Sequence, residues 1–170
     1  MNRAYLAFTE KGLALAQKLA SALPGTVARC GHGGPGLADW TAEQFAHTDA
    51  LIFVGAVGIA VRAIAPHCRN KAVDPAVVVL DECGHFAVPI LSGHLGGAND
   101  LARALAAVCG AVPVITTATD ANGVFAVDAW ARHQNCAVLE PGRIKRVSSR
   151  LLAGCLLYTS PSPRDRSLSR

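Results

Sequence analysis

The chain is 170 residues long, which leaves room for one ordinary domain, or for one domain and a fragment of a second. Hydrophobic residues make up 51% of it and charged residues only 16%, so we expect a real buried core and exclude a disordered polymer. The net charge of +4 is too small for the dense basic face that nucleic acid requires, so no nucleic-acid partner is predicted.

In chain order, the first half alternates between strands and helices. The expected elements are a strand at 4–8, a helix at 10–22, a strand at 27–30, a loop at 31–36, a short helix at 41–46 and a strand at 50–54. Thr9 is placed to cap the first helix, and Pro24-Gly25 ends it. The run at 50–54 is apolar on both faces, which is typical of a strand in the middle of a sheet.

The second half continues the alternation. It contains a helix between Gly58 and Pro66, strands at 76–80, 86–91, 112–115 and 137–139, and helices from the 92–99 turn to about 109, at 125–133 and at 143–152. The strand at 86–91 follows Gly84 closely enough to be a hairpin partner of the strand before it. The whole pattern predicts an α/β fold with a mostly parallel sheet and helices on both faces, a Rossmann-like three-layer arrangement.

The sequence gives little indication of a membrane span, a signal peptide or a metal site. The apolar stretch at 50–61 contains Gly55 and Gly58 and ends at Arg62, short of the ~18 apolar residues of a membrane span. Charges at Glu10 and Lys11 argue against a signal peptide, so we expect a cytoplasmic protein and no membrane partner. The six cysteines form no CxxC pair and the histidines lack metal-ligand spacing, so no metal site is predicted.

Ligands of a sheet of this kind bind outside the carboxyl ends of its strands. The turns that follow strands are 55–58, 81–84, 92–99 and 116–120. We therefore expect these four turns to form a single polar pocket at that edge.

The turn from Gly55 to Gly58 lacks the third glycine of a dinucleotide fingerprint. A helix that begins there would direct N–H groups at an anionic ligand such as a carboxylate, and Arg62 would pair with the same group. The alternative is that the glycines serve only close packing and that Arg62 is a solvated surface residue.

The turn from Ser92 to Asn99 carries the most specific signal, because glycines, a hydroxyl, an imidazole and an amide are crowded at one strand-to-helix junction. The candidate substrate-binding residues there are Ser92, Gly93, Gly96, Gly97 and Asn99. The hydroxyl and the backbone N–H groups offer donors for an oxyanion, and His94 is suited to move a proton near neutral pH. The alternative is that Ser92 merely caps the helix and His94 packs in the core.

Two further turns carry polar side chains. Asp81 and Glu82 end a buried strand, where desolvation would raise a carboxyl pKa and produce a general acid or base. Thr116 and Thr117 open a hydroxyl-rich loop that is suited to bind carboxylates. In both turns, capping of the neighbouring structure is the alternative interpretation.

Four motifs together resemble the N-terminal region of the CbiG family, the cobalt-precorrin-5A hydrolases of anaerobic cobalamin biosynthesis. They span 53–66, 74–84, 89–99 and 116–120, and they include Leu-Ser-Gly-His-Leu-Gly-Gly-Ala-Asn and Thr-Thr-Ala-Thr-Asp. The resemblance runs from roughly residue 6 to residue 154.

The resemblance implies a hydrolase that opens the δ-lactone of a cobalt-corrinoid substrate on the route to vitamin B12 and releases acetaldehyde. It implies no cofactor, because the substrate carries the cobalt, and it points to other cobalamin-pathway enzymes as partners. In that chemistry Glu82 or His94 would act as the base, and the backbone of residues 92–97 would supply oxyanion donors.

Family members are longer, with a middle segment and a C-terminal α/β domain. We therefore expect a CbiG N-terminal-like α/β domain at 1–136, the start of a truncated middle segment at 137–154 and a non-native tail at 155–170. That Ser/Pro/Arg-rich tail resembles read-through of adapter or cloning sequence, the alternative being a natural tail. A fragment of this kind is expected to bind weakly or to be inactive alone.

Two other functions stay open from the residues. One is a non-catalytic corrinoid-binding module, and the other is a sugar-phosphate or nucleotide-binding enzyme that uses the same helix termini.

Overall fold

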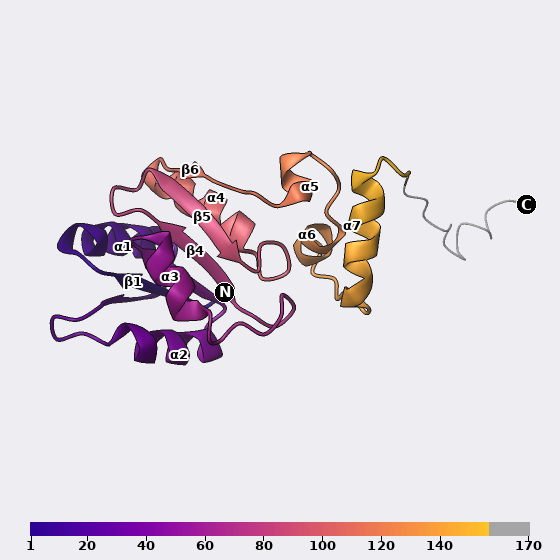
Figure 1. The fold of residues 1–170 in the computed structure, drawn as a ribbon. Coiled ribbons are helices and arrows are strands. Elements are labelled where there is room, and N and C mark those ends of the chain that lie inside the picture. Colours follow the sequence, from indigo (N-terminus) through magenta and orange to yellow (C-terminus); the bar gives the residue numbers. More distant parts are fainter. Residues whose placement is uncertain (157–170) are drawn as a thin grey trace, which may run out of the picture.

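A computed structural model describes residues 1–156, so most of the predicted non-native tail at 155–170 lies outside the described residues. The elements are β1 (Arg3–Ala7), α1 (Glu10–Ala22), β2 (Thr26–Arg29), α2 (Leu37–His47), β3 (Ala50–Val54), α3 (Val57–Ile64), β4 (Ala76–Leu80), β5 (Phe86–Leu91), α4 (Ala98–Cys109), β6 (Val112–Pro113), α5 (Ala118–Ala121), α6 (Val127–His133), the 3-10 turn η1 (Pro141–Arg143) and α7 (Ile144–Leu152). Figure 1 shows their arrangement.

The six strands form one sheet in the order β2-β1-β3-β4-β5-β6. Strands β1 to β4 run parallel to one another, as expected for strands joined by helical crossovers. Strand β5 pairs antiparallel with β4, and β6 runs parallel to β5. The hairpin predicted at this point is therefore present, and it reverses the last two strands of the sheet.

Helices cover both faces of the sheet, and β3 shows how. Ala50, Ile52 and Val54 share one buried cluster with residues of α1 and α4, whereas Leu51 and Phe53 share the other with residues of α2 and α3. Alternate residues of a strand point to opposite faces, so a strand with helices on both sides is apolar throughout. The predicted three-layer α/β fold is confirmed.

Local signals account for several element ends. Thr9 caps α1, since its hydroxyl accepts a hydrogen bond from the backbone N–H of Gly12 at 3.0 Å. Gly110 ends α4 in the left-handed conformation, with φ +80°. The element starts expected at 50, 76 and 86 agree with the structure.

The prediction failed mainly after β6. The strand expected at 137–139 is absent from the described structure, and Leu139 is 93% exposed, because this short apolar run lies beyond the last strand of the sheet. Within the 116–120 loop, residues from Ala118 onward form a helical turn, α5. In Figure 1, α5, α6 and α7 group together beside the sheet.

None of the helices within residues 1–156 is both long enough and apolar enough to span a bilayer.

Replacing a side chain in the middle layer should be costly. Ile52 is fully buried in β3, so Ile52→Ala is expected to lower the free energy of unfolding by about 2–5 kcal/mol through lost burial and an unfilled cavity. Val61→Ala, at a side chain that is 46% exposed, is the matched control and should change it by less than about 0.5 kcal/mol. Urea unfolding followed by circular dichroism measures both, and equal losses would contradict this description of the core.

Candidate functional site

The candidate site residues lie at two opposite edges of the sheet. Because β5 runs back along β4, with Leu91 opposite Val77, the turn after β5 lies beside the start of β4. The hydroxyl of Ser92 accordingly donates to the carbonyl of Asp74, just before β4, at 2.8 Å. The single pocket predicted at the carboxyl edge is therefore wrong.

The two groups have different members. At the carboxyl edge of the parallel strands lie Gly55, Gly58, Arg62 and Glu82, after β3 and β4. At the amino edge lie Ser92, Gly93, His94, Gly96, Gly97 and Asn99, joined by the loop that carries Thr116 and Thr117. Glu82 and His94, the two alternative bases, are separated by the length of a strand.

The amino-edge group is centred on His94, whose two ring nitrogens each meet a carboxylate. Nε2 lies 2.6 Å from Oδ2 of Asp120 in α5, and Nδ1 lies 3.2 Å from Oδ1 of Asp128 in α6. The side chains of His94 and Asp128 are 14% and 6% exposed. The imidazole thus joins the turn after β5 to the helices α5 and α6.

Asp120 receives further donors. Its carboxylate accepts hydrogen bonds from the Thr117 hydroxyl at 2.7 Å, the Asn99 amide at 3.2 Å and the Arg103 guanidinium at 2.6 Å. Burial by itself would raise the pKa of Asp120, but His94, Thr117 and Arg103 outweigh it and hold that pKa well below its usual value. Asp120 is therefore a carboxylate at every physiological pH.

The same contacts raise the pKa of His94 to about 9. The hydrogen bond to Asp128 contributes most, desolvation opposes it, and the hydrogen bond to Asp120 adds to it. At neutral pH His94 is therefore an imidazolium whose two N–H groups donate to carboxylates. In this state it is a proton donor, and it has no free nitrogen to serve as the base considered above.

Asn99 supplies the one unpaired acceptor of this group. It is 3% exposed, and its amide nitrogen donates to Thr117 at 2.9 Å, whereas Oδ1 has no hydrogen-bond partner among the described residues. Gly93 lies against this oxygen, since a Cβ at Gly93 would come within 2.8 Å of it. A buried acceptor without a donor is costly, so this oxygen is suited to bind a water molecule or a ligand hydroxyl.

Part of the expected oxyanion-donor set at residues 92–97 is already used, since the N–H of Gly97 donates to the His94 carbonyl at 3.0 Å. The Ser92 hydroxyl is committed to Asp74, and Ser92 has a left-handed backbone with φ +54°. The N–H groups of Ala98 and Asn99 donate to the carbonyls of Ser92 and Gly93 at 3.1 and 3.0 Å. The hydroxyl therefore ties the turn to the segment before β4, and the alternative that Ser92 caps the helix is wrong, since Gly97 is the cap residue of α4.

Gly96 and Gly97 also have structural roles. A Cβ at Gly96 would lie 2.5 Å from Cβ of Ser92, and Gly97 caps α4 with φ +84°. Of the two threonines, Thr117 belongs to the Asp120 network, and Thr116 is exposed.

The carboxyl-edge group does not assemble a comparable network. The N–H of Gly55 donates to the Leu80 carbonyl at 2.8 Å, and a Cβ at Gly55 would come within 2.6 Å of Phe8, so this glycine serves close packing. Arg62 is exposed and donates to the Gly58 carbonyl at 3.4 Å. Glu82 accepts a hydrogen bond from the Thr9 hydroxyl at 2.8 Å.

A hollow of about 640 Å³ opens beside the His94 turn at the amino edge. Leu95 and Gly96 line it together with Met1, Asp49, Asp74 and Arg132. Arg132, in α6, also forms an ion pair with Asp100 of α4. The hollow thus presents to a ligand the carboxylates of Asp49 and Asp74, a guanidinium that is already paired, and the backbone of the glycine-rich turn.

Residues 39–120 match the family described as Cobalamin synthesis G N-terminal. This region of the chain belongs to the CbiG family. Two curated relatives named cobalt-precorrin-5A hydrolase are similar to it. The protein from Salmonella typhimurium is 46% identical over an alignment of 140 positions that covers 78% of this chain and 40% of that protein. The protein from Priestia megaterium is 48% identical over 82 residues, which are 48% of this chain and 22% of that protein.

The chain therefore spans less than half the length of these curated relatives. The CbiG resemblance inferred from the four motifs is confirmed. The fold is also similar to that of a cobalamin biosynthesis protein G homolog from Sulfolobus solfataricus, with a TM-score of 0.58 at 22% identity, over 96% of this chain and 52% of that one.

The ion pairs of His94 with Asp120 and Asp128 should make the stability of the protein depend on pH. The pKa of His94 rises from 6.5 to about 9 on folding, so its contribution is complete below pH 6.5 and is lost as the pH rises through 9. His94→Gln should lower the free energy of unfolding on the order of 2 kcal/mol at pH 6, and by much less at pH 10. Urea unfolding at both pH values measures this, and a difference independent of pH would contradict a charged His94.

Proposed function

We propose that this chain is part of a hydrolase that opens the δ-lactone of cobalt-precorrin-5A and releases acetaldehyde. The observation that carries the proposal is the meeting of two CbiG motifs, the Ser92–Asn99 turn and the Thr116–Asp120 loop, in one buried polar group around His94. The similarity to the two curated hydrolases supports the choice of substrate. Since the chain spans only part of those relatives, the activity is assigned to the whole protein.

In the proposed reaction, Asn99 and His94 have complementary roles. Oδ1 of Asn99 accepts a hydrogen bond from the attacking water, which orients it toward the lactone carbonyl. The imidazolium of His94 turns one N–H from its carboxylate partner to the lactone, where it protonates the departing alkoxide, and the proton that the attacking water releases then restores the imidazolium. Asp128 keeps the other N–H and stabilises the charge that His94 carries.

The hollow at the amino edge would receive an edge of the corrinoid ring. Corrinoid intermediates carry acetate and propionate groups, and Arg132 lies where it can pair with one of these carboxylates. The substrate brings its own cobalt, so no cofactor of the protein is proposed. A cytoplasmic location and contact with other cobalamin-pathway enzymes complete the proposal.

The direct test is incubation of the whole protein that contains this chain with cobalt-precorrin-5A, because the activity is assigned to the whole protein. Acetaldehyde is measured by a coupled alcohol dehydrogenase assay, and binding by the change in the corrinoid absorption spectrum. Release of acetaldehyde would support the hydrolase, and binding without product would favour the non-catalytic corrinoid-binding module. No binding and no product would contradict the proposal and favour a sugar-phosphate or nucleotide ligand.

The two alternative acid–base residues can be told apart by matched variants. His94→Gln should lower kcat for acetaldehyde release by at least about 100-fold, because it removes the proposed proton donor. Glu82→Gln, at the opposite edge of the sheet, should leave kcat within about twofold, since its partner is the Thr9 hydroxyl. An equal or larger loss with Glu82→Gln would overturn the assignment to His94.

A further inference from the structure

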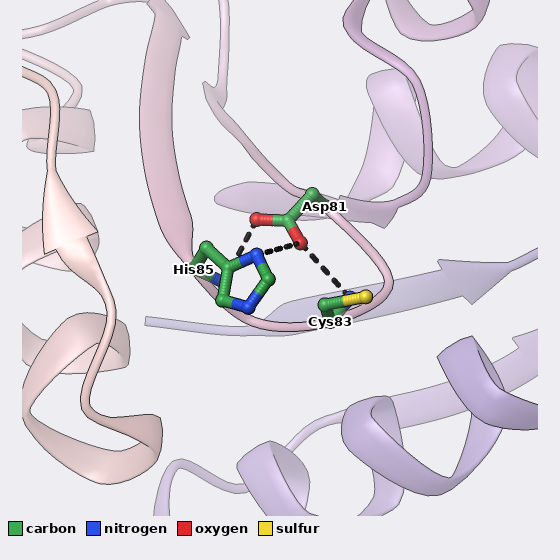
Figure 2. Close-up of side chains that lie close together, drawn as sticks. All are labelled: Asp81, Cys83 and His85. Carbon is green, nitrogen blue, oxygen red and sulfur yellow. Dashed lines mark hydrogen bonds and ion pairs between the residues drawn. The ribbon is translucent and has the colours of Figure 1, made fainter.

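A second group of chemically reactive side chains lies in the turn between β4 and β5, at the carboxyl edge. Figure 2 shows Asp81, Cys83 and His85 around this turn, with the imidazole of His85 facing the carboxylate of Asp81 and Sγ of Cys83 pointing away from the ring. One ligand atom from each, namely a carboxylate oxygen, Sγ and a ring nitrogen, lies within 4.8 Å of the other two. We propose that this turn binds a divalent transition-metal ion of the Zn²⁺ type.

Asp81 is the fixed member of the group. Its Oδ2 accepts hydrogen bonds from the backbone N–H groups of His85 and Phe86 at 2.8 and 2.7 Å, and its Oδ1 accepts one from Cys83 at 2.9 Å. Each carboxylate oxygen has two lone pairs, so Oδ1 keeps one that is free to bind an ion. The backbone contacts that shape the turn therefore also hold a ligand atom in place.

The spacing of the donor atoms fits a small four-coordinate ion. Bond lengths of roughly 2.0–2.3 Å place neighbouring ligands of a tetrahedral Zn²⁺ about 3.4–3.6 Å apart. Nδ1 of His85 already lies 3.6 Å from Oδ1 of Asp81. Cys83 and His85 are exposed side chains, so closing the remaining distance to Sγ requires rotation at the surface and no movement of the core.

The types of ligand select the class of ion. A thiolate with an imidazole and a carboxylate favours Zn²⁺ or Co²⁺, whereas Mg²⁺ and Ca²⁺ require sets of oxygen ligands. Three protein ligands leave a fourth position for water. The sequence predicted no metal site because the three residues alternate along a turn and lack the CxxC spacing, and only the fold brings them to one point.

Lys11 of α1 competes with the ion for Cys83. Its Nζ donates to Sγ of Cys83 at 2.9 Å, and this contact raises the pKa of Lys11. Lys11 is an exposed, flexible side chain, so an ion can displace it. Removal of this charge should therefore strengthen metal binding at this turn.

The test is titration of the folded chain with Co²⁺ and then with Zn²⁺. We expect one Co²⁺ per chain, with the near-ultraviolet charge-transfer band of a thiolate ligand, and displacement of the Co²⁺ by Zn²⁺. Cys83→Ser should abolish the band, and His85→Gln should weaken binding at least about tenfold. Lys11→Met should tighten it.

Cys136→Ser and His47→Gln are the matched controls, because both residues are exposed and lie outside this turn. They should leave the band and the affinity unchanged. The proposal would be overturned if no Co²⁺ band formed, if Cys83→Ser kept it, or if the controls weakened binding as much as His85→Gln. Circular dichroism of each variant confirms that the chain is folded.

Discussion

The antiparallel pairing of β5 with β4 decides which residues of this chain can meet. A parallel strand at this position would deliver the Ser92 turn to the same edge as Gly55 and Glu82. Because β5 instead returns along β4, it delivers that turn to the amino edge, beside the start of β4 and the loop after β6. The composition of both polar groups follows from this single reversal.

At the amino edge, charge balance holds the C-terminal helices against the sheet. The imidazolium of His94 lies between the carboxylates of Asp120 and Asp128, and the guanidinium of Arg103 pairs with Asp120 and with Asp100. Buried or half-buried charges are tolerated in such a set because each has a hydrogen-bonded partner. Removal of one member leaves another without a partner, so the stability of this group depends on all of its members together.

The sequence predicted the fold and part of the site, for identifiable reasons. The apolar runs of β3 and β4 have a length and periodicity that indicate buried strands, and their bounds were predicted correctly. The Ser92–Asn99 turn was singled out because its residue types are unusual for a simple connection. The sequence marks Asp120 only as the end of a hydroxyl-rich loop, and it gives no signal for Asp128, which is a lone Asp in a short helix.

The prediction that all four polar turns lie at the carboxyl edge was wrong for a physical reason. The short connection at 81–85 did indicate a hairpin, and a hairpin always reverses direction, so the position of the Ser92 turn was contained in that prediction. The rule that places ligands at carboxyl ends applies to parallel strands, and β5 is not one of them. Ser92, with its left-handed backbone, was beyond sequence reasoning because such a conformation is rare outside glycine.

The length of β4 separates the two polar groups and limits how strongly the charges of one group act on the other. Five residues of extended chain span about 17 Å, which exceeds the Debye length of roughly 8 Å at physiological ionic strength. Exposed charges added or removed at one end of the strand are therefore largely screened from the other end, and the separation itself weakens the influence of the buried ones. Evolution and mutagenesis can alter either end independently, and the free energies of paired substitutions should sum.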